Sequence, residues 1–167
     1  MILSLRAHSS AFLFGFLVPA IAVLVADLAS KSFFFKWLGY HERFSVFEPL
    51  LYFTTVTNQG VAWGIFPWAH RLLLLLIPLL LAGIFIHAWR ARKADTFQLI
   101  CLGAIFGGAA GNYYDRLVHG AVRDFIDVKF GALYDFPIFN LADAAISISV
   151  ALMLLRQFLV RQRPPVS

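Results

Sequence analysis

The chain has little charge for its length, and this scarcity excludes most soluble folds. Charged residues make up 14% of its 167 residues, whereas 60% are hydrophobic. Soluble domains carry roughly 25% charged residues, and the mean hydropathy here is +0.77. A soluble protein of this size could not bury so much apolar surface, so the composition indicates an integral membrane protein.

Cysteine and histidine are also scarce. The single cysteine, Cys101, has no partner for an intrachain disulfide and lies in an apolar run, where we expect it to pack rather than to act as a nucleophile. The histidines are scattered, so we expect no zinc-type cluster and no cofactor. The net charge of +5 accompanies no nucleic-acid motif. Basic residues in such a chain set membrane topology and contact anionic lipid head groups.

Long apolar runs are abundant, and four of them approach the ~20 residues that cross a bilayer. The predicted transmembrane helices cover about 11–29, 71–89, 96–114 and 138–160. Within the third, Gly103, Gly107 and Gly111 recur at four-residue spacing and line one helix face, which lets another helix approach closely. The predicted fold class is therefore an all-α polytopic membrane protein, a single domain over residues 1–167.

The segment of about 32–70, between the first two predicted helices, mixes aromatic and charged residues. Leu50–Thr57 is rich in β-branched and aromatic residues, which is typical of a strand, and Asn58–Gly60 is typical of a turn. Trp63, Phe66 and Trp68 suit a membrane interface. We expect a small extracytoplasmic β-structured cap with an interfacial helix, and an outer loop over about 115–137.

Basic residues beside the predicted helices suggest the orientation in the membrane. The two sides carry equal numbers of Lys and Arg, but those on the side of both termini cluster in short segments: Arg6, Arg90, Arg92, Lys93, Arg156, Arg161 and Arg163. Since such clusters tend to stay in the cytoplasm, we expect both termini there. The first helix lacks a good Ala-x-Ala site, so we expect it to remain uncleaved.

Two aspartates lie at the predicted membrane boundary. A carboxylate there costs free energy, so its presence suggests a function. Asp124 lies in the outer loop and Asp143 near the start of the fourth helix. A structural interpretation makes Asn140 the N-cap of that helix and Asp143 a favourable charge at its positive end. A similar interpretation makes Asp124 a solvated loop residue paired with Arg123 or Lys129.

Further polar residues gather at the same predicted helix ends. Asn112, Asp115 and Arg116 end the third helix, where Asp115 and Arg116 are expected to form a local ion pair or to anchor the loop. Asp27 and Lys31 are four residues apart with the acid first, which favours a helical ion pair that holds the first helix to the cap.

Taken together, these residues would place two carboxylates in one polar cluster. Close carboxylates tend to share one proton, because two adjacent negative charges repel each other. The charged member can take a proton from water, and the neutral member can donate to a carbonyl oxygen. If Asp124 and Asp143 meet, the pattern predicts hydrolysis of an amide without a metal or a covalent intermediate.

Five sequence blocks occur in order along nearly the whole chain. They are Asp27–Lys31 (DLASK), Asn58–Trp63 (NQGVAW), Gly107–Arg116 (GGAAGNYYDR), Val122–Asp127 (VRDFID) and Phe139–Asp143 (FNLAD). Each block alone is weakly specific, but together they make the chain similar to the bacterial lipoprotein signal peptidases (signal peptidase II), a family of intramembrane aspartyl proteases. Leu28 stands where the family usually has Gln, and Trp63 where it usually has Phe.

The resemblance implies roles for individual residues. Asp124 and Asp143 match the catalytic dyad. Positions that bind the substrate or support the site are matched by Asn58, Gly60, Asn112, Asp115, Arg116, Asn140, Ala142, Asp27 and Lys31. Of the two departures, Leu28 removes a polar contact and Trp63 enlarges a ring near the pocket, and neither touches the dyad.

The resemblance also implies a substrate and a location. The substrate is a prolipoprotein whose lipobox cysteine carries diacylglycerol, cut on the amino side of that cysteine. The enzyme is expected in the bacterial cytoplasmic (inner) membrane, with its site near the outer, periplasmic face, and the antibiotic globomycin is expected to bind. We expect a monomer that contacts membrane lipids and needs no metal.

Three alternatives stay open on the sequence alone. A proton-coupled transporter or channel subunit would also carry intramembrane carboxylates, although such proteins favour acids near mid-bilayer and internal repeats. A non-catalytic binding protein of the same fold would not need both aspartates. A presenilin-type protease would carry Gly-x-Gly-Asp on a helix, and this sequence lacks that motif.

Overall fold

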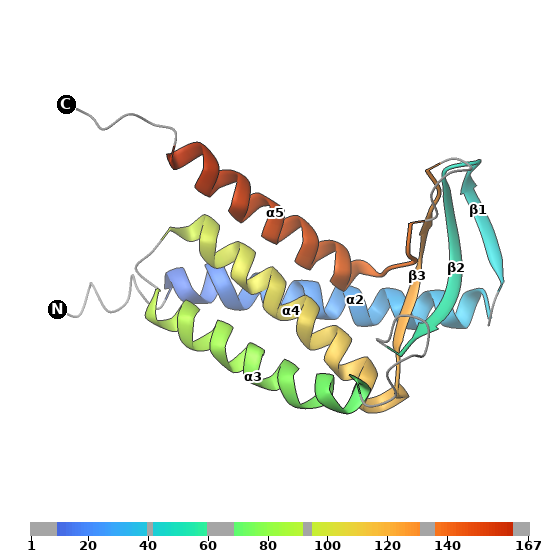
Figure 1. The fold of residues 1–167 in the computed structure, drawn as a ribbon, viewed down its shortest axis with the longest axis horizontal. Coiled ribbons are helices and arrows are strands. Elements are labelled where there is room, and N and C mark those ends of the chain that lie inside the picture. The colour runs from blue at the N-terminus through green and yellow to red at the C-terminus, as the bar shows by residue number, and fades with distance from the viewer. Residues whose placement is uncertain (1–9, 40–41, 60–68, 92–94, 131–135, 162–167) are drawn as a thin grey trace.

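Long helices run through most of the molecule, and a small sheet lies at one end of them (Figure 1). The computed structural model describes residues 10–39, 42–59, 69–91, 95–130 and 136–161. Gly60 and Trp63, together with the interfacial helix expected around Trp63, Phe66 and Trp68, lie outside the described residues.

The helical elements follow the apolar runs of the sequence. They are a π-helical segment η1 (Leu13–Leu17), α2 (Val18–Trp37), α3 (Ala69–Arg90), α4 (Thr96–His119) and α5 (Leu141–Arg161). Helix α4 begins with the side chain of Asp95 accepting a hydrogen bond from the backbone N–H of Phe97 at 3.1 Å. Beyond α4 and α2, Gly120 and Gly39 adopt φ angles of 72° and 69°, a left-handed geometry that favours glycine after a helix.

Three helices within the described residues are long and apolar enough to cross a membrane: Ser10–Trp37, Arg71–Arg90 and Leu141–Arg161. The expected fourth, α4, is not among them. Its C-terminal half carries Asn112, Asp115 and Arg116 between Gly111 and Gly120, and these polar residues lower its hydropathy. The structure therefore shows three candidate spans, one fewer than the sequence predicted.

Helix α4 packs against α2, α3, α5 and η1. A Cβ atom at Gly103 or Gly107 would overlap the backbone carbonyl oxygen of Phe16 or Ala20, respectively. Because these glycines carry no side chain, the backbone of α4 lies in direct contact with η1 at Gly103 and with α2 at Gly107, as their four-residue spacing predicts.

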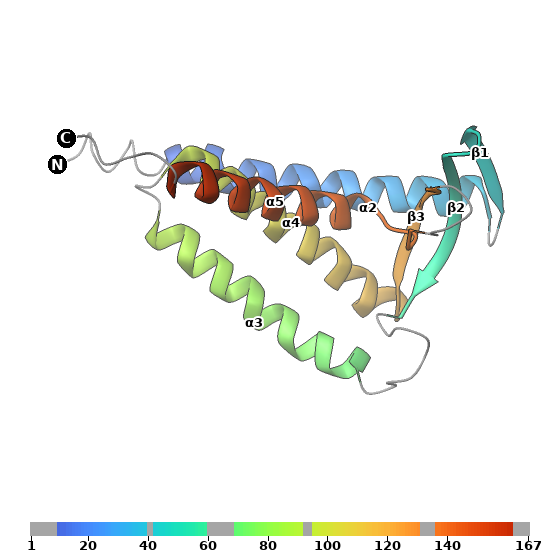
Figure 2. The same cartoon turned by 45° about the horizontal axis from the view of Figure 1, so that its top comes forward.

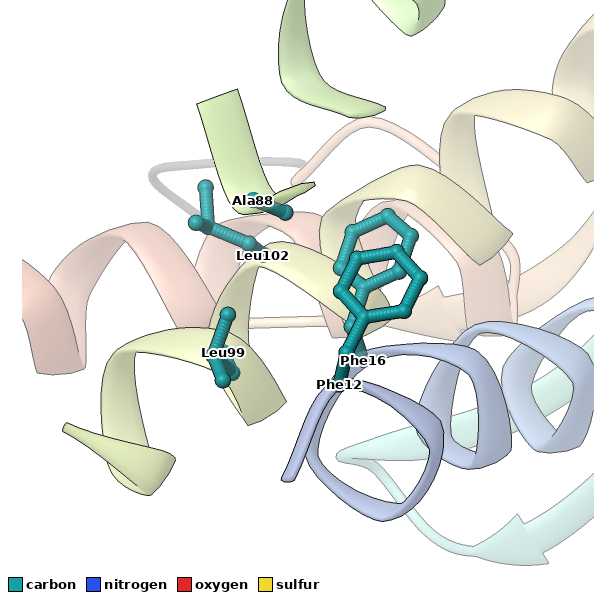
Figure 3. Close-up of a cluster of buried hydrophobic side chains, with 5 residues drawn as sticks. All are labelled: Phe12, Phe16, Ala88, Leu99 and Leu102. Carbon is teal, nitrogen blue, oxygen red and sulfur yellow. The ribbon is translucent and has the colours of Figure 1, made fainter. Parts of the chain in front are cut away.

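A hydrophobic cluster joins η1, α3 and α4 at the end of the helices away from the sheet. Its buried members are Phe12, Phe16, Ala88, Leu99 and Leu102 (Figure 3). The rings of Phe12 and Phe16 stack with their centroids 5.1 Å apart. The cluster fixes the spacing of the helices at this end.

The sheet has three antiparallel strands in the described residues: β1 (Arg43–Phe47), β2 (Leu51–Asn58) and β3 (Val122–Val128), in the order β1-β2-β3. The sequence predicted a strand over the segment that forms β2. Strand β3 falls in the segment expected to be an outer loop, so the loop interpretation is wrong for these residues.

The segment Val122–Val128 forms a strand because each of its two edges has a hydrogen-bonding partner. One edge pairs with β2. On the other edge, Phe139 donates its backbone N–H to Ile126 at 3.0 Å and accepts the N–H of Ile126 at 2.8 Å. The ring of Phe125 stacks on Phe34 of α2 with centroids 4.4 Å apart. Strand formation therefore depends on tertiary partners rather than on local propensity.

Figures 1 and 2 show the sheet at the end of the helices where α2 and α4 finish and α5 begins. The start of the helix that leads into α2 and the end of α5 lie at the opposite end. The polar helix ends therefore meet β3 on one side of the molecule, and the hydrophobic cluster lies on the other.

Candidate active site

Asp124 enters the polar cluster from β3. Its side chain is 2% exposed. One carboxylate oxygen accepts a hydrogen bond from Asn140 Nδ2 at 2.6 Å, and the other accepts from Asn58 Nδ2 of β2 at 3.1 Å. Two neutral amides thus hold a buried carboxyl in place without an ion pair of its own among the described residues.

Asp143 enters from the first turn of α5 and is half-buried. Its backbone N–H donates to Asn140 Oδ1 at 2.9 Å, and its carboxylate accepts the backbone N–H of Asn140 at 3.3 Å. This reciprocal pair is a capping box, which confirms the prediction of Asn140 as N-cap. Asp143 also accepts a hydrogen bond from Asn112 Nδ2 at 2.7 Å.

Two asparagines connect the carboxylates. Asn140 Nδ2 donates to Asn112 Oδ1 at 3.1 Å as well as to Asp124. A continuous path of hydrogen bonds therefore runs from Asp124 through Asn140 and Asn112 to Asp143. The two aspartates, which are distant along the chain, share one network across β3, α4 and α5.

The environment of Asp124 favours its protonated form. Burial raises the pKa of Asp124 from 3.8 to about 7, and the nearby charge of Asp143 adds to this effect. The hydrogen bonds from Asn58 and Asn140 oppose it. A carboxyl with this pKa can carry a proton near neutral pH, which is the property that an acid catalyst needs.

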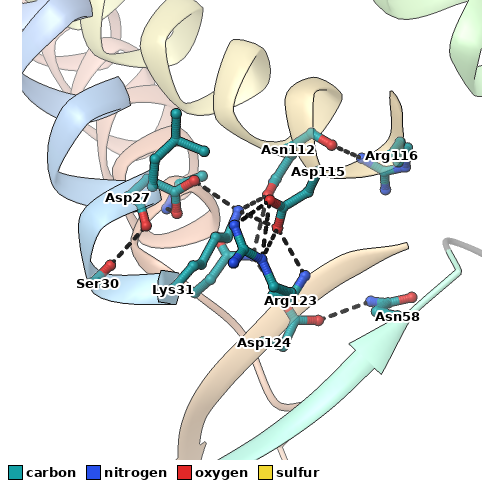
Figure 4. A network of polar contacts seen from close by, with 12 residues as sticks. Asp27, Ser30, Lys31, Asn58, Asn112, Asp115, Arg116, Arg123 and Asp124 are labelled. Atoms are coloured by element: carbon teal, nitrogen blue, oxygen red, sulfur yellow. Dashed lines mark hydrogen bonds and ion pairs between the residues drawn. The ribbon is translucent and has the colours of Figure 1, made fainter. Parts of the chain in front are cut away.

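A buried charge cluster lies beside Asn112 (Figure 4). Lys31 Nζ lies 2.7 Å from Asp27 and 3.3 Å from Asp115. Arg123 donates to both carboxylate oxygens of Asp115, from its backbone N–H at 3.0 Å and from Nη2 at 2.8 Å. The two cations balance the two anions, as buried charges require. Lys31 also donates to Asn112 Oδ1 at 2.8 Å.

The pairing of Asp115 corrects one expectation and settles another. Asp115 pairs with Arg123 and Lys31 and not with Arg116 among the described residues. Adjacent residues on a helix point in different directions, so Asp115 and Arg116 cannot face each other. The alternative expectation, that Asp115 anchors the segment after the helix, agrees with its contacts to Arg123, the second residue of β3. Arg123 is the site residue whose role the sequence did not reveal.

Asp27 and Ala142 link α2 to the start of α5. The backbone N–H of Ala142 donates to Asp27 Oδ1 at 3.0 Å, while Lys31 binds the other oxygen. A Cβ atom at Gly111 would overlap the Asp27 carboxylate, and one at Gly108 would lie 2.8 Å from the carbonyl oxygen of Ala142. The glycine-rich face of α4 therefore makes room for the residues that orient α5.

Arg116 lies at the edge of this cluster. Its Nη1 donates to the backbone carbonyl of Asn112 at 3.1 Å, and its buried Nε has no hydrogen-bond partner among the described residues. The charges of Asp143 and Asp124 both act on its guanidinium. Arg116 thus lies within the electrostatic influence of both carboxyls.

The site brings together all but one of the residues that the sequence nominated. Gly60 lies outside the described residues. The described residues contain no group of three or more His, Cys, Asp or Glu side chains that could hold a metal ion. The donors present are amides and carboxyls, arranged around one carboxyl that favours its proton.

Comparison with known proteins shows which family this chain resembles in sequence. The sequence profile of the family described as "Signal peptidase (SPase) II" matches residues 19–159. The lipoprotein signal peptidase of Aquifex aeolicus (strain VF5) is 40% identical over 149 residues, covering 87% of this chain and 87% of that protein. The lipoprotein signal peptidase of Staphylococcus carnosus (strain TM300) is 35% identical over 136 residues, covering 81% and 84%. The chain belongs to the signal peptidase II family.

A solved structure described as a bacterial membrane enzyme supports the same assignment for the fold of this chain. It matches with a TM-score of 0.77 and 29% identity, over 84% of this chain and 90% of that chain. Family membership confirms the resemblance carried by the five sequence blocks. The protein is a multi-pass membrane protease with the function of a lipoprotein signal peptidase, and the transporter interpretation is set aside.

Proposed function

We propose that this signal peptidase II is an aspartic endopeptidase in which Asp124 and Asp143 form the catalytic dyad. The observation that carries the proposal is the path of hydrogen bonds through Asn140 and Asn112 that links the two carboxyls. Burial and the charge of Asp143 raise the pKa of Asp124 to about 7. One proton can therefore be shared unequally between the two groups, as acid–base hydrolysis requires.

The chemistry follows from this unequal sharing. Asp143, as the carboxylate, takes a proton from a water molecule whose oxygen attacks the scissile carbonyl carbon. Asp124, as the acid, donates its proton to the carbonyl oxygen, so a neutral tetrahedral intermediate forms. When the C–N bond breaks, Asp143 passes its proton to the leaving nitrogen and the intermediate returns one to Asp124. The dyad ends in its starting state.

The surrounding residues have supporting roles in this proposal. Asn140 and Asn112 orient the carboxyls, and Asn58 holds Asp124 from β2. Arg116, on which the charges of both carboxyls act, is proposed to hold the substrate backbone. Asp27, Lys31, Asp115 and Ala142 fix α2, α4 and α5 relative to one another, and Gly60 is proposed to line the site.

The proposed substrate is a prolipoprotein whose lipobox cysteine already carries diacylglycerol, cut on the amino side of that cysteine. The relatives carry the name lipoprotein signal peptidase, and exposed apolar residues along α3 and α5 suit lipid and an apolar signal helix. We expect globomycin to bind the same site, and the enzyme to act as a monomer.

The proposed topology has four spans, with α4 as the third along the chain and both termini in the cytoplasm. The site then lies near the outer face of the bacterial cytoplasmic membrane, where water is available. Packing of α4 against α2, α3 and α5 supports this arrangement, because a helix enclosed by spanning helices can carry polar residues that would be costly in lipid.

The test is cleavage of a diacylglyceryl-modified prolipoprotein by the purified protein in detergent. We expect Asp124→Asn and Asp143→Asn to fold but to lose at least roughly a thousandfold in kcat, since each removes one proton-transfer step. Asp127→Asn is the matched control, because Asp127 is 4% exposed on the same strand and pairs with Arg43 and Lys129 instead.

The control should retain most of its activity, and the wild type should cut before the lipidated cysteine. A folded Asp124→Asn or Asp143→Asn variant that cuts as fast as the wild type would refute the dyad. The non-catalytic binding interpretation would gain support if the wild type bound this substrate without cutting it.

A further inference from the structure

Strand β2 changes its register against β3 just before it reaches the site. Phe53 pairs with Ile126, whereas Val56 pairs with Asp124, so three residue steps on β2 match two steps on β3. The extra residue lies at Thr54–Thr55, where both side chains are buried. Such bulges re-aim the side chains that follow them and occur beside active sites.

The side chain of Thr55 ties this bulge to the end of α2. Its Oγ1 donates a hydrogen bond to the backbone carbonyl of Gly39, the residue of positive φ that follows α2. Thr55 is 0% exposed, so this bond gives its buried hydroxyl a partner that water cannot replace. The neighbouring Thr54 Oγ1 donates to the carbonyl of Glu42 at 3.0 Å.

The residues after the bulge depend on its register. Val56, Thr57 and Asn58 pair with Asp124, Arg123 and Val122, respectively. A slip of one residue in a strand moves every following side chain to the opposite face of the sheet. Without the bulge, Asn58 would therefore leave the face from which it donates to Asp124 at 3.1 Å.

We propose that Thr55 is a positioning residue for the acid of the dyad: its hydroxyl, bonded to Gly39, maintains the bulge that places Asn58 on Asp124. This inference rests on the proposed function, because it assigns Thr55 an effect on the acid that Asp124 supplies. Thr55 precedes Val56, the residue of β2 that pairs with Asp124, and it acts on the acid through Asn58.

The charged groups that face Asp124 come from three other elements. They are Asp143 of α5, Lys31 of α2 and Arg116 of α4. Among the described residues, none of these groups forms a hydrogen bond or an ion pair with Thr55. A change at Thr55 that alters the titration of Asp124 must therefore pass through the strand and Asn58.

The test compares Thr55→Val with Thr55→Ser in the cleavage assay, with kcat/KM measured across pH. Valine keeps the shape of threonine but lacks the hydroxyl, whereas serine keeps the hydroxyl. Because the hydrogen bond from Asn58 lowers the pKa of Asp124, its loss should move the alkaline limb of the profile up by roughly 0.5–1 pH unit. We expect this shift for Thr55→Val and a profile like the wild type for Thr55→Ser.

A double-mutant cycle separates positioning from general destabilisation. Asn58→Ala should show the same shift, and adding Thr55→Val to it should move the limb no further. Ser32→Ala is the matched control, since it removes an exposed hydroxyl that donates to a backbone carbonyl, that of Leu28, at 2.8 Å. We expect it to keep the wild-type profile.

An unmoved limb in Thr55→Val, or an equal shift in the Asn58→Ala background, would overturn the inference. If Thr55→Val does not fold, Thr55→Cys replaces it, and its weaker thiol donor should give an intermediate shift, with an unshifted limb again counting against the role. The inference fails separately from the dyad, because an active Asp124→Asn variant would refute the dyad whatever Thr55 does.

Discussion

Asp124 is buried in a place where its charge is unfavourable, and this links the stability of the protein to pH. Its pKa is raised from 3.8 to about 7, first by burial and then by the charge of Asp143. Between these two values the folded protein holds a proton that the unfolded chain has released. The contribution of Asp124 to the free energy of unfolding is therefore fully present below about pH 4 and is lost as pH rises toward 7.

We predict that Asp124→Asn flattens this part of the pH dependence. Over the interval from pH 4 to 7, the wild type should lose up to about 1.4 kcal/mol of unfolding free energy per pH unit relative to the variant. The measurement is chemical unfolding in detergent at several pH values, with Asp127→Asn as the control. If the unfolding free energies of the wild type and Asp124→Asn changed equally with pH, the raised pKa of Asp124 would be contradicted.

Some features of the site could be predicted from single residues and others could not. Asn140 and Asp143 lie three residues apart after Pro137, so their capping arrangement follows from local spacing. The contact between Asn112 and Asn140 depends on how α4 docks against α5. Helix docking is a property of two surfaces, and spacing along one chain does not reveal it.

At the scale of elements, α4 determines how closely the other helices approach. Gly103 brings its backbone against η1 and Gly107 brings it against α2, while Gly111 accommodates the Asp27 carboxylate. Two uses of glycine therefore lie on one helix: close packing far from the site and space for a charged group beside it. Substitution along this face should disturb the site even where the residue is remote from it.

We predict that Gly107→Ala destabilises the protein, because a Cβ there would overlap the carbonyl oxygen of Ala20. Overpacking of this kind typically costs roughly 1–3 kcal/mol. Gly83→Ala in α3 is the matched control, since a Cβ at Gly83 meets nothing within 4 Å and alanine is the better helix former by roughly 1 kcal/mol.

Thermal unfolding of the detergent-solubilised variants measures both effects. The midpoint should fall for Gly107→Ala and should hold or rise for Gly83→Ala. Equal behaviour of the two variants would mean that α2 and α4 do not lie in backbone contact.

Strand β3 shows why one element escaped prediction. Its sequence, VRDFIDV, carries charges that are typical of a loop. Its hydrogen-bond partners are β2 and Phe139, and its ring contact is with Phe34. Helices α2, α3 and α5 follow from their own apolar runs, whereas β3 exists only when segments from three other parts of the chain are assembled.

At the scale of the whole molecule, the number of spans decides on which side of the membrane each end lies. Three helices qualify as spans by length and hydropathy, and we propose α4 as a fourth. With four spans, the turn between β1 and β2 and the C-terminus lie on opposite sides of the membrane. With three, in which α4 does not cross, they lie on the same side.

Cysteine labelling can therefore count the spans without a structure in lipid. In a Cys101→Ser background, Glu48→Cys places a thiol in the exposed β1–β2 turn, and Ser167→Cys places one at the C-terminal residue of the sequence. In spheroplasts, a membrane-impermeant maleimide should label Glu48→Cys at once and Ser167→Cys only after the membrane is permeabilised. Labelling of both before permeabilisation would mean three spans. Labelling of Ser167→Cys alone would keep four spans but reverse the orientation, and the dyad would then face the cytoplasm.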